Sequence, residues 1–255
     1  MRVVKRTVFY IALLLLTACS ASPEKAPSPA VSASSASSTS SASFASSSFA
    51  SSYPLPPNPN PNPNPNPVPY TVRLSVPFSP QAPFANWDQL HEETCEEMSL
   101  LLVHHYLKGT NITREQAEAE LLALVEWEEA HGYPQDVTVA ELGKIAEEYF
   151  GYHARVIPNP TEEDMKRELA EGHPIIVPAA GRDLGNPYFS GDGPWYHMLV
   201  LTGYGEFFFI TNDVGTKRGE GYKYRFDTLL KAIHDWTGAK EEIRTGAKRV
   251  LVIEK

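Results

Sequence analysis

Composition changes abruptly near residue 70 of this 255-residue chain. Residues 20–52 are almost entirely Ser and Ala, and residues 54–69 alternate Pro with Asn over most of their length. Neither segment can bury enough apolar surface to offset its ordering entropy. Alternating proline favours polyproline II at about 3.1 Å per residue, so the second segment predicts a semi-rigid spacer of roughly 50 Å. We therefore expect residues 20–69 to be a disordered tether and residues 70–255 to hold the packed core.

The first 19 residues have the pattern of an export signal. A basic start, with Arg2, Lys5 and Arg6, precedes an apolar run that is too short to span a bilayer stably. The run ends in Leu-Thr-Ala-Cys, which resembles the lipobox of bacterial lipoproteins and implies lipidation of Cys19. We expect residues 1–19 to be a lipoprotein signal peptide, and the mature chain to be extracytoplasmic and membrane-anchored. The alternative is an ordinary secretory signal with an unrelated cysteine.

Acidic residues are concentrated in the part of the chain that can fold. Only four of the 22 Lys and Arg residues and one of the 31 Asp and Glu residues precede residue 70, which leaves 18 basic and 30 acidic residues and a net charge of −12. Such a surface does not suit nucleic acid or an anionic lipid face. We expect no nucleic-acid partner, and contact with the membrane only through the lipid on Cys19.

Capping residues and glycines mark a helical first half of this domain. The first helical stretch begins at Cys95, and the three that follow each begin with a threonine that has an acidic or amide residue three positions later. This spacing is typical of helix starts, and a glycine ends each stretch, as at many helix ends. Four helices are therefore expected, over residues 95–109, 113–132, 138–151 and 161–172.

Short apolar runs replace the helical periodicity after Gly172. Such runs predict β-strands, and Gly203-Tyr204-Gly205 between two of them indicates a hairpin. A further helix is expected over residues 226–236. Helices followed by antiparallel strands indicate an α+β domain with a cleft between its two halves. The four strands are expected over residues 174–179, 197–202, 207–211 and 249–253.

Cys95 is the candidate nucleophile. The chain has two cysteines, and once Cys19 is lipidated Cys95 has no disulfide partner within the chain. A thiolate at a helix start gains from the helix dipole and from unpaired N–H groups, which lower its pKa. The alternative is a small buried hydrophobic residue, but the polar neighbours Thr94 and Glu96 favour a reactive thiol at the helix entrance.

His197 is the candidate base for Cys95. It begins a predicted strand directly after a loop rich in Gly, Pro and aromatic residues, and His173 is the second choice. A hairpin centred on Gly205 would place Asp213 opposite His197, with Cβ atoms about 5 Å apart. A shift of one residue would bring Asn212 there instead, and parity does not decide between the two.

An ordered set of short motifs resembles one peptidase family. The motifs at residues 76–81, 95–99, 197–204 and 212–213 together look like the bacteriocin-processing (double-glycine leader) type of papain-like cysteine peptidase, family thirty-nine of the cysteine peptidases, in its stand-alone branch. The resemblance covers most of residues 70–255. It implies a papain-like α+β fold in which a helical half precedes an antiparallel sheet half.

The resemblance also implies roles for individual residues. The nucleophile, the general base and acid, and the orienting carboxylate would be, in chain order, Cys95, His197 and Asp213. Asn212 is the alternative third member. The glutamine that donates to the oxyanion would be Gln81 from its Val-Pro-x-x-x-Gln context, or Gln89, which lies six residues before the cysteine.

One departure from the family pattern leaves the activity open. Relatives often have Gly after the cysteine, where this chain has Glu96. An adjacent carboxylate opposes thiolate formation, although a helix start also stabilises it. Glu96 is therefore expected either to face solvent without effect or to mark a domain that has lost turnover. The two hypotheses are a peptidase acting through a thioester, with cell-wall amides as a second substrate class, and an inactive peptide-binding module.

Neither a metal nor another cofactor is expected. The stretch His91-Glu92-Glu93-Thr94-Cys95 begins like a zinc-peptidase helix but lacks the second histidine. The glycine-containing segment 214–219 reproduces neither a calcium loop nor a phosphate cradle. The expected partner is a peptide or protein substrate.

Overall fold

The computed structural model describes residues 68–255. The predicted signal peptide, the lipidation site Cys19 and nearly all of the predicted tether lie outside the described residues. Among residues 68–255, none of the helices combines the length and the apolar character that crossing a bilayer requires.

The predicted helices are confirmed, with two differences at their ends. The α-helix after Asn159–Pro160 ends at Ala170, with Glu171 as its C-cap, and not at Gly172. The last α-helix ends at Ala232 because the next residue, Ile233, leaves the helical conformation and forms a β-bridge with Ala179. The helices are α1 (Cys95–Lys108), α2 (Arg114–His131), α3 (Val139–Phe150), α4 (Glu162–Ala170) and α5 (Phe226–Ala232), with short 3₁₀ helices at His91–Glu93, Gly181–Leu184 and Lys240–Thr245.

Capping boxes begin three of these helices. Thr113, Thr138 and Thr161 each accept a hydrogen bond from the backbone three residues on, and the side chain at that position accepts one in return. Each such cap contributes about 1 kcal/mol to stability. The start of α1 differs, because Thr94 makes no side-chain capping hydrogen bond there.

The strands form one antiparallel seven-stranded sheet, in the order β2-β7-β3-β4-β5-β6 with β1 paired to β4. The four predicted strands are present. Strands β2 and β6 lie at the two edges, where many side chains face solvent, so neither has an apolar run to reveal it in the sequence. The strands are β1 (Val72–Arg73), β2 (His153–Pro158), β3 (Ile175–Ala180), β4 (Tyr196–Tyr204), β5 (Phe208–Asn212), β6 (Glu220–Arg225) and β7 (Arg249–Glu254).

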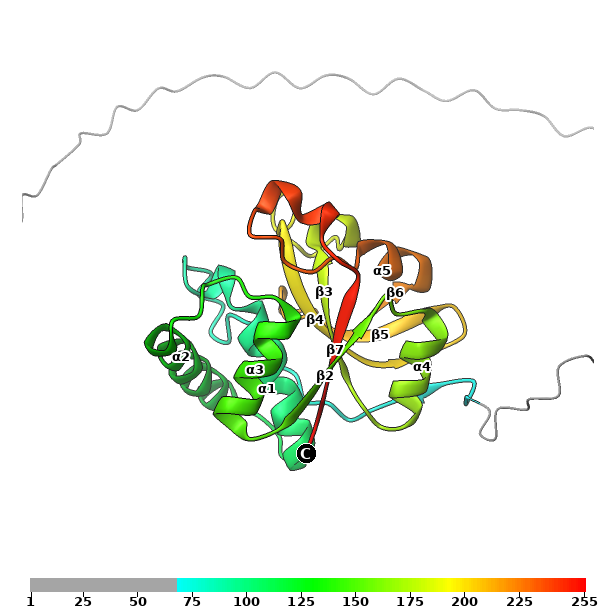
Figure 1. Ribbon diagram of the computed structural model, residues 1–255, viewed down its shortest axis with the longest axis horizontal. Helices are drawn as coiled ribbons and strands as arrows, with labels where there is room; N and C mark the ends of the chain where they lie inside the picture. Colours follow the sequence, from blue (N-terminus) through cyan, green and yellow to red (C-terminus); the bar gives the residue numbers. More distant parts are fainter. Residues whose placement is uncertain (1–67) are drawn as a thin grey trace, which may run out of the picture. The chain divides into compact units, whose positions relative to one another are not determined.

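The sheet separates two apolar cores. Ile176 and Met198 belong to the core shared with α1, α2 and α3, whereas Ile175 and Leu199 belong to the core shared with α4 and α5. Figure 1 shows α1 and α3 on one side of the sheet, with α2 beyond them, and α4 and α5 on the other side. Strands β3 and β4 are therefore buried on both faces, which explains their uninterrupted apolar runs. The predicted α+β class is confirmed, but β2 follows α3 and joins the sheet, so the two halves interlock.

The β4–β5 hairpin has a different register from the one predicted. Val200 pairs with Asn212, and a β-bulge lies between Leu201 and Gly203. This pairing is displaced by two residues from a hairpin centred on Gly205, so Asp213 lies just beyond the end of β5 and not directly opposite His197. Because this displacement is even on the Val200 side of the bulge, His197 and Asp213 stay on the face that was predicted for them.

Candidate active site

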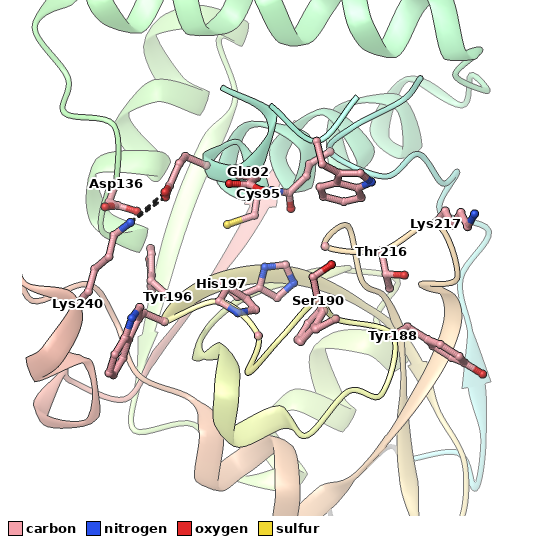
Figure 2. Close-up of a pocket in the computed structure, with 18 of the residues that line it drawn as sticks. Glu92, Cys95, Asp136, Tyr188, Ser190, Tyr196, His197, Thr216, Lys217 and Lys240 are labelled. Carbon is pink, nitrogen blue, oxygen red and sulfur yellow. Dashed lines mark hydrogen bonds and ion pairs between the residues drawn. The ribbon is translucent and has the colours of Figure 1, made fainter. Parts of the chain in front are cut away.

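A cleft of about 620 Å³ brings several of the predicted site residues together. Gln81, Cys95 and His197 all line it. Figure 2 shows Cys95 on the helical wall and His197 on the sheet wall, with Lys240 at one end of the cleft and Lys217 at the other. The start of α1 and the start of β4 therefore face each other across the cleft.

Cys95 is the first residue of α1 and is 5 % exposed. Its Sγ accepts a hydrogen bond from the backbone N–H of Met198 at 3.2 Å, and it donates to Glu96 Oε2 at 2.9 Å. Burial, and next the adjacent Glu96 carboxyl, raise the pKa of the Cys95 thiol well above its usual value. The expected lowering of this pKa by the helix start is therefore wrong for the resting protein, because burial outweighs it.

Glu96 lies inside the protein, so the expectation that it might face solvent is wrong. Its side chain is fully buried, and Oε1 accepts a hydrogen bond from the backbone N–H of Val137 at 3.4 Å. Burial, and next the charge of Glu97, raise the pKa of Glu96 well above its usual value. The Cys95 thiol and the Glu96 carboxyl, which are in hydrogen-bond contact, therefore both have raised pKa values that favour the protonated form.

His197 is held on three sides. Its Nε2 lies 2.8 Å from Asp213 Oδ1, and its ring meets the Phe189 ring edge to face, with centroids 5.3 Å apart. A Cβ added at Gly215 would lie 2.8 Å from His197 Cε1, so only glycine leaves room for the ring there. Because Nε2 is hydrogen-bonded to Asp213, Nδ1 is the ring nitrogen that is available to groups in the cleft. Among the described residues, Cys95 Sγ is hydrogen-bonded to Glu96 and Met198 and not to His197 Nδ1.

Asp213 is fully buried and accepts four hydrogen bonds. Oδ1 accepts from His197 and from the backbone N–H of Gly215, and Oδ2 accepts from Asn186 Nδ2 at 2.9 Å and from Tyr224 Oη at 2.5 Å. Burial alone would raise the pKa of Asp213, but His197 and the hydrogen bonds outweigh it and hold this pKa below its usual value. The carboxylate is therefore ionised, and it orients the imidazole.

The alternatives for the third residue and for the base lie elsewhere. The Asn212 amide donates to the carbonyl oxygens of Val76 and Pro77, at 3.2 and 3.0 Å, and not to the imidazole. His173 Nδ1 lies 3.1 Å from Glu168 Oε2, in an ion-pair network with Arg155. The structure therefore brings together His197 and Asp213.

The two candidate glutamines are also separated. Gln81 lines the cleft, whereas Gln89 lines a different pocket. The Gln81 Nε2 donates to the carbonyl oxygen of His91 at 2.8 Å, which fixes the orientation of the amide. A primary amide carries two N–H groups, so one is left for a ligand in the cleft.

Comparison with known proteins identifies the family. The model of the Peptidase_C39 like family matches residues 73–242. This chain belongs to the Peptidase_C39-like family. Among solved structures, a candidate C39-like peptidase from Bacillus anthracis matches with 14 % identity and a TM-score of 0.49, over 72 % of this chain and 98 % of that one. A search of curated proteins finds no match.

Membership confirms that this C39-like chain is a cysteine peptidase by family, and the described helices and antiparallel sheet agree with the α+β fold that the resemblance implied. The family match does not distinguish the bacteriocin-processing type or a lipoprotein carrier, which stay predictions of the sequence. The residue roles likewise stay predictions, now with a geometry that can be tested.

Sequence reasoning missed two residues that hold the site of this C39-like protein. Asn186 and Tyr224 both donate to Asp213 Oδ2, and the Asn186 amide also donates to Tyr224 Oη at 2.8 Å. Tyr224 lies on the unpredicted edge strand β6, and Asn186 lies in a loop 27 residues before Asp213. The Asn186-Pro187 dipeptide marks a turn, but no local signal links it to the carboxylate.

One group of potential metal ligands occurs in the described part of the C39-like domain. Ligand atoms of Glu168, Glu171 and His173 lie within 4.8 Å of one another. Arg155 already binds both Glu168 carboxylate oxygens, at 2.9 and 2.8 Å. The group is therefore explained as an ion-pair network.

Proposed function

We propose that this protein is a membrane-tethered, extracytoplasmic cysteine peptidase that hydrolyses peptide bonds with Cys95, His197 and Asp213. The observation that carries the proposal is the buried hydrogen bond between His197 and Asp213, on the wall of the cleft that faces Cys95. A thiol, an imidazole and a carboxylate in this order are the groups that acyl transfer through a thioester requires.

The hydrogen-bond network supports the direction of proton transfer. The ionised Asp213 accepts from Nε2 of His197, which turns Nδ1 toward the cleft as the nitrogen that would take the proton of Cys95. Since the pKa of the buried thiol is raised, the thiolate forms as this proton moves to His197. The thiolate then attacks the peptide carbonyl, the imidazolium gives its proton to the leaving amine, and water hydrolyses the thioester.

We infer two hydrogen-bond donors for the oxyanion. One is the backbone N–H of Cys95 at the start of α1, where no side chain caps the helix. The other is the second amide N–H of Gln81, which lines the same cleft. A pair of such donors stabilises the charge that develops on the carbonyl oxygen in the transition state.

The membrane tether and the extracytoplasmic location are supported by the sequence of residues 1–19 alone. An apolar run that ends in Leu-Thr-Ala-Cys19 supports lipidation of that cysteine, and the Pro/Asn-rich segment before residue 70 suits a spacer between membrane and peptidase.

Cleavage of a peptide mixture tests the proposed activity. The wild-type protein and the Cys95→Ala variant are incubated with a synthetic library of peptides, and new termini are measured by mass spectrometry. We expect cleavage by the wild type and at least a thousandfold less by the variant, because the nucleophile is absent. Cleavage at equal rates, or no cleavage by either protein under any condition, would refute the assignment.

A further inference from the structure

A second pocket, of about 390 Å³, lies behind the first turn of α1. Its walls come from the residues before α1, from the first turn of α1, from the C-terminal half of α2 and from the segment after α2. Glu93 lines both this second pocket and the catalytic cleft, so the two hollows share one wall.

The floor of the second pocket holds three buried oxygen atoms without a hydrogen-bond partner among the described residues. They are Thr94 Oγ1, Glu97 Oε2 and Glu128 Oε1. All three residues line the pocket, and each is at most 4 % exposed. A buried polar atom without a partner costs free energy, and almost all such atoms in native proteins are satisfied. These oxygens therefore indicate a ligand that donates hydrogen bonds to them.

The charge of the pocket points to a cation. Four carboxyl groups line it, and no Lys, Arg or His is among its lining residues. One of the four, Glu93, is already paired with Lys240 of the catalytic cleft, at 3.0 and 3.1 Å, which leaves three for a ligand. Burial, and next the charge of Glu128, raise the pKa of Glu97 well above its usual value. Burial also raises the pKa of Glu128 to about 7, although its contact with Glu97 lowers it. A bound cation would offset the effect of the Glu128 charge on Glu97. The lining carboxyl groups belong to Glu93, Glu97, Glu128 and Glu129.

Apolar side chains complete the pocket. Leu90 and Val125 lie on its walls together with the ring of Tyr133 and with Pro134. A ligand that fits all of these features has an apolar stem and a cationic head with several N–H donors. Arginine and lysine side chains have this form, because their methylene stems pack on apolar surface while their heads donate hydrogen bonds.

We propose that the second pocket binds an arginine or lysine side chain of the polypeptide substrate while the catalytic cleft holds the scissile peptide bond. This inference rests on the proposed peptidase function. The head group donates to Glu97, Glu128 and Thr94, and the substrate chain crosses the shared wall at Glu93. The pocket therefore selects substrates with a basic residue at one fixed position.

Binding to a catalytically blocked protein tests the pocket without requiring turnover. The Cys95→Ala variant is titrated with N-acetyl-arginine amide and with N-acetyl-citrulline amide, which has nearly the same shape but no charge, and amide shifts are followed by NMR. We expect saturable shifts at Thr94, Glu97 and Glu128 with the arginine compound, and at least tenfold weaker binding of the citrulline compound. Equal binding of the two compounds overturns the inference.

Charge-matched variants locate the binding. Glu97→Gln and Glu128→Gln remove one carboxylate each from different helices, whereas Glu115→Gln makes the same change on an exposed part of α2 outside the pocket. With correct folding checked by thermal unfolding, we expect each pocket variant to weaken arginine binding about tenfold and the control to leave it unchanged. Equal loss in all three variants would contradict the assignment.

Peptides distinguish a substrate side chain from a free small cation. Hexapeptide libraries with arginine or citrulline fixed at one position at a time are measured for binding to Cys95→Ala and for cleavage by the wild type. We expect one position at which arginine improves binding and kcat/KM about tenfold, with the preference lost in Glu97→Gln and in Glu128→Gln. Binding of the arginine amide without any preference among the peptides overturns the substrate assignment. A binding preference without cleavage supports the pocket and refutes only the proposed peptidase activity.

Discussion

At the scale of single residues, Glu96 contributes to the protonation of Cys95. Burial, and next the Glu96 carboxyl in contact with Cys95 Sγ, raise the pKa of that thiol. Glu96→Gln keeps the size of the side chain and removes the acid, so the pKa of the thiol should fall. We expect the rate of Cys95 alkylation by iodoacetamide at pH 7 to rise about tenfold, the equivalent of one pKa unit. Glu115→Gln serves as the control, and an unchanged rate in Glu96→Gln would refute this role.

Gly215 is a second residue whose role can be measured. A Cβ at this position would lie 2.8 Å from His197 Cε1 and 3.0 Å from Phe189 Cε1. Gly215→Ala should therefore displace the imidazole from Asp213 and lower kcat at least tenfold, with a change in melting temperature of only a few degrees. The pair of measurements is peptide turnover and thermal unfolding; full activity in this variant would show that the ring is not clamped as described.

Residues marked by a local sequence pattern were predicted to line the cleft, and residues that reach the site without such a pattern were missed. Cys95 and His197 each stand at the start of an element, and local patterns revealed both. Asn186 and Tyr224 reach Asp213 from a loop and an edge strand, so no single stretch of sequence carries that information. The burial of Glu96 also escaped prediction, because it depends on the segment at Val137 that covers the first turn of α1.

At the scale of elements, the buried carboxyl groups of Glu97 on α1 and Glu128 on α2 make the free energy of unfolding depend on pH. Burial raises the folded-state pKa of Glu128 to about 7, so the folded protein holds a proton that the unfolded chain has released above pH 4.5. Stability should therefore fall as pH rises from about 4.5 to about 7. The Glu128→Gln variant has no carboxyl to ionise at this position. Over the same pH range, its free energy of unfolding should fall less than that of the wild type, by on the order of 2 kcal/mol.

Urea unfolding at pH 5 and at pH 7.5 measures this effect. The wild type should lose more stability between the two pH values than Glu128→Gln, while the exposed control Glu115→Gln should follow the wild type. A variant that loses as much stability as the wild type would mean that the pair ionises freely in the folded protein.

Helix ends were easier to predict than strands, for a physical reason. The capping boxes at Thr113, Thr138 and Thr161 are hydrogen bonds between residues three positions apart, so a short stretch of sequence predicts them. Edge strands depend on pairing with distant partners. The hairpin register depends on the position of the turn and on a bulge in β4, which together displace the pairing at Val200 by two residues. The even shift kept His197 and Asp213 within hydrogen-bond distance although the predicted pairing was wrong.

At the scale of the whole molecule, the proposal places the peptidase domain on a lipid tether. In a bacterial host, the full chain should fractionate with membranes and incorporate labelled palmitate, because Cys19 would be diacylated. Cys19→Ser should abolish the labelling and release the protein from the membrane fraction, with peptidase activity retained. Labelling that persists in Cys19→Ser would contradict the lipoprotein assignment.

The acidic domain and the acidic second pocket are both consistent with a basic polypeptide substrate. The net charge of −12 on residues 70–255 would favour basic polypeptides, and the proposed pocket at Glu97 and Glu128 would bind one basic side chain. General charge affects the rate of association and is screened by salt, whereas the pocket affects the choice of cleavage site.

The central claim is that Cys95 acts with His197, and the pH dependence of thiol labelling tests it most directly. A thiol-reactive peptide probe is reacted with the wild type and with His197→Ala between pH 5 and pH 10, and modification of Cys95 is measured by mass spectrometry. The account predicts labelling of the wild type at neutral pH and at least a hundredfold slower labelling of His197→Ala, whose buried thiol has lost its base. Equal labelling of the two proteins across this range would contradict it.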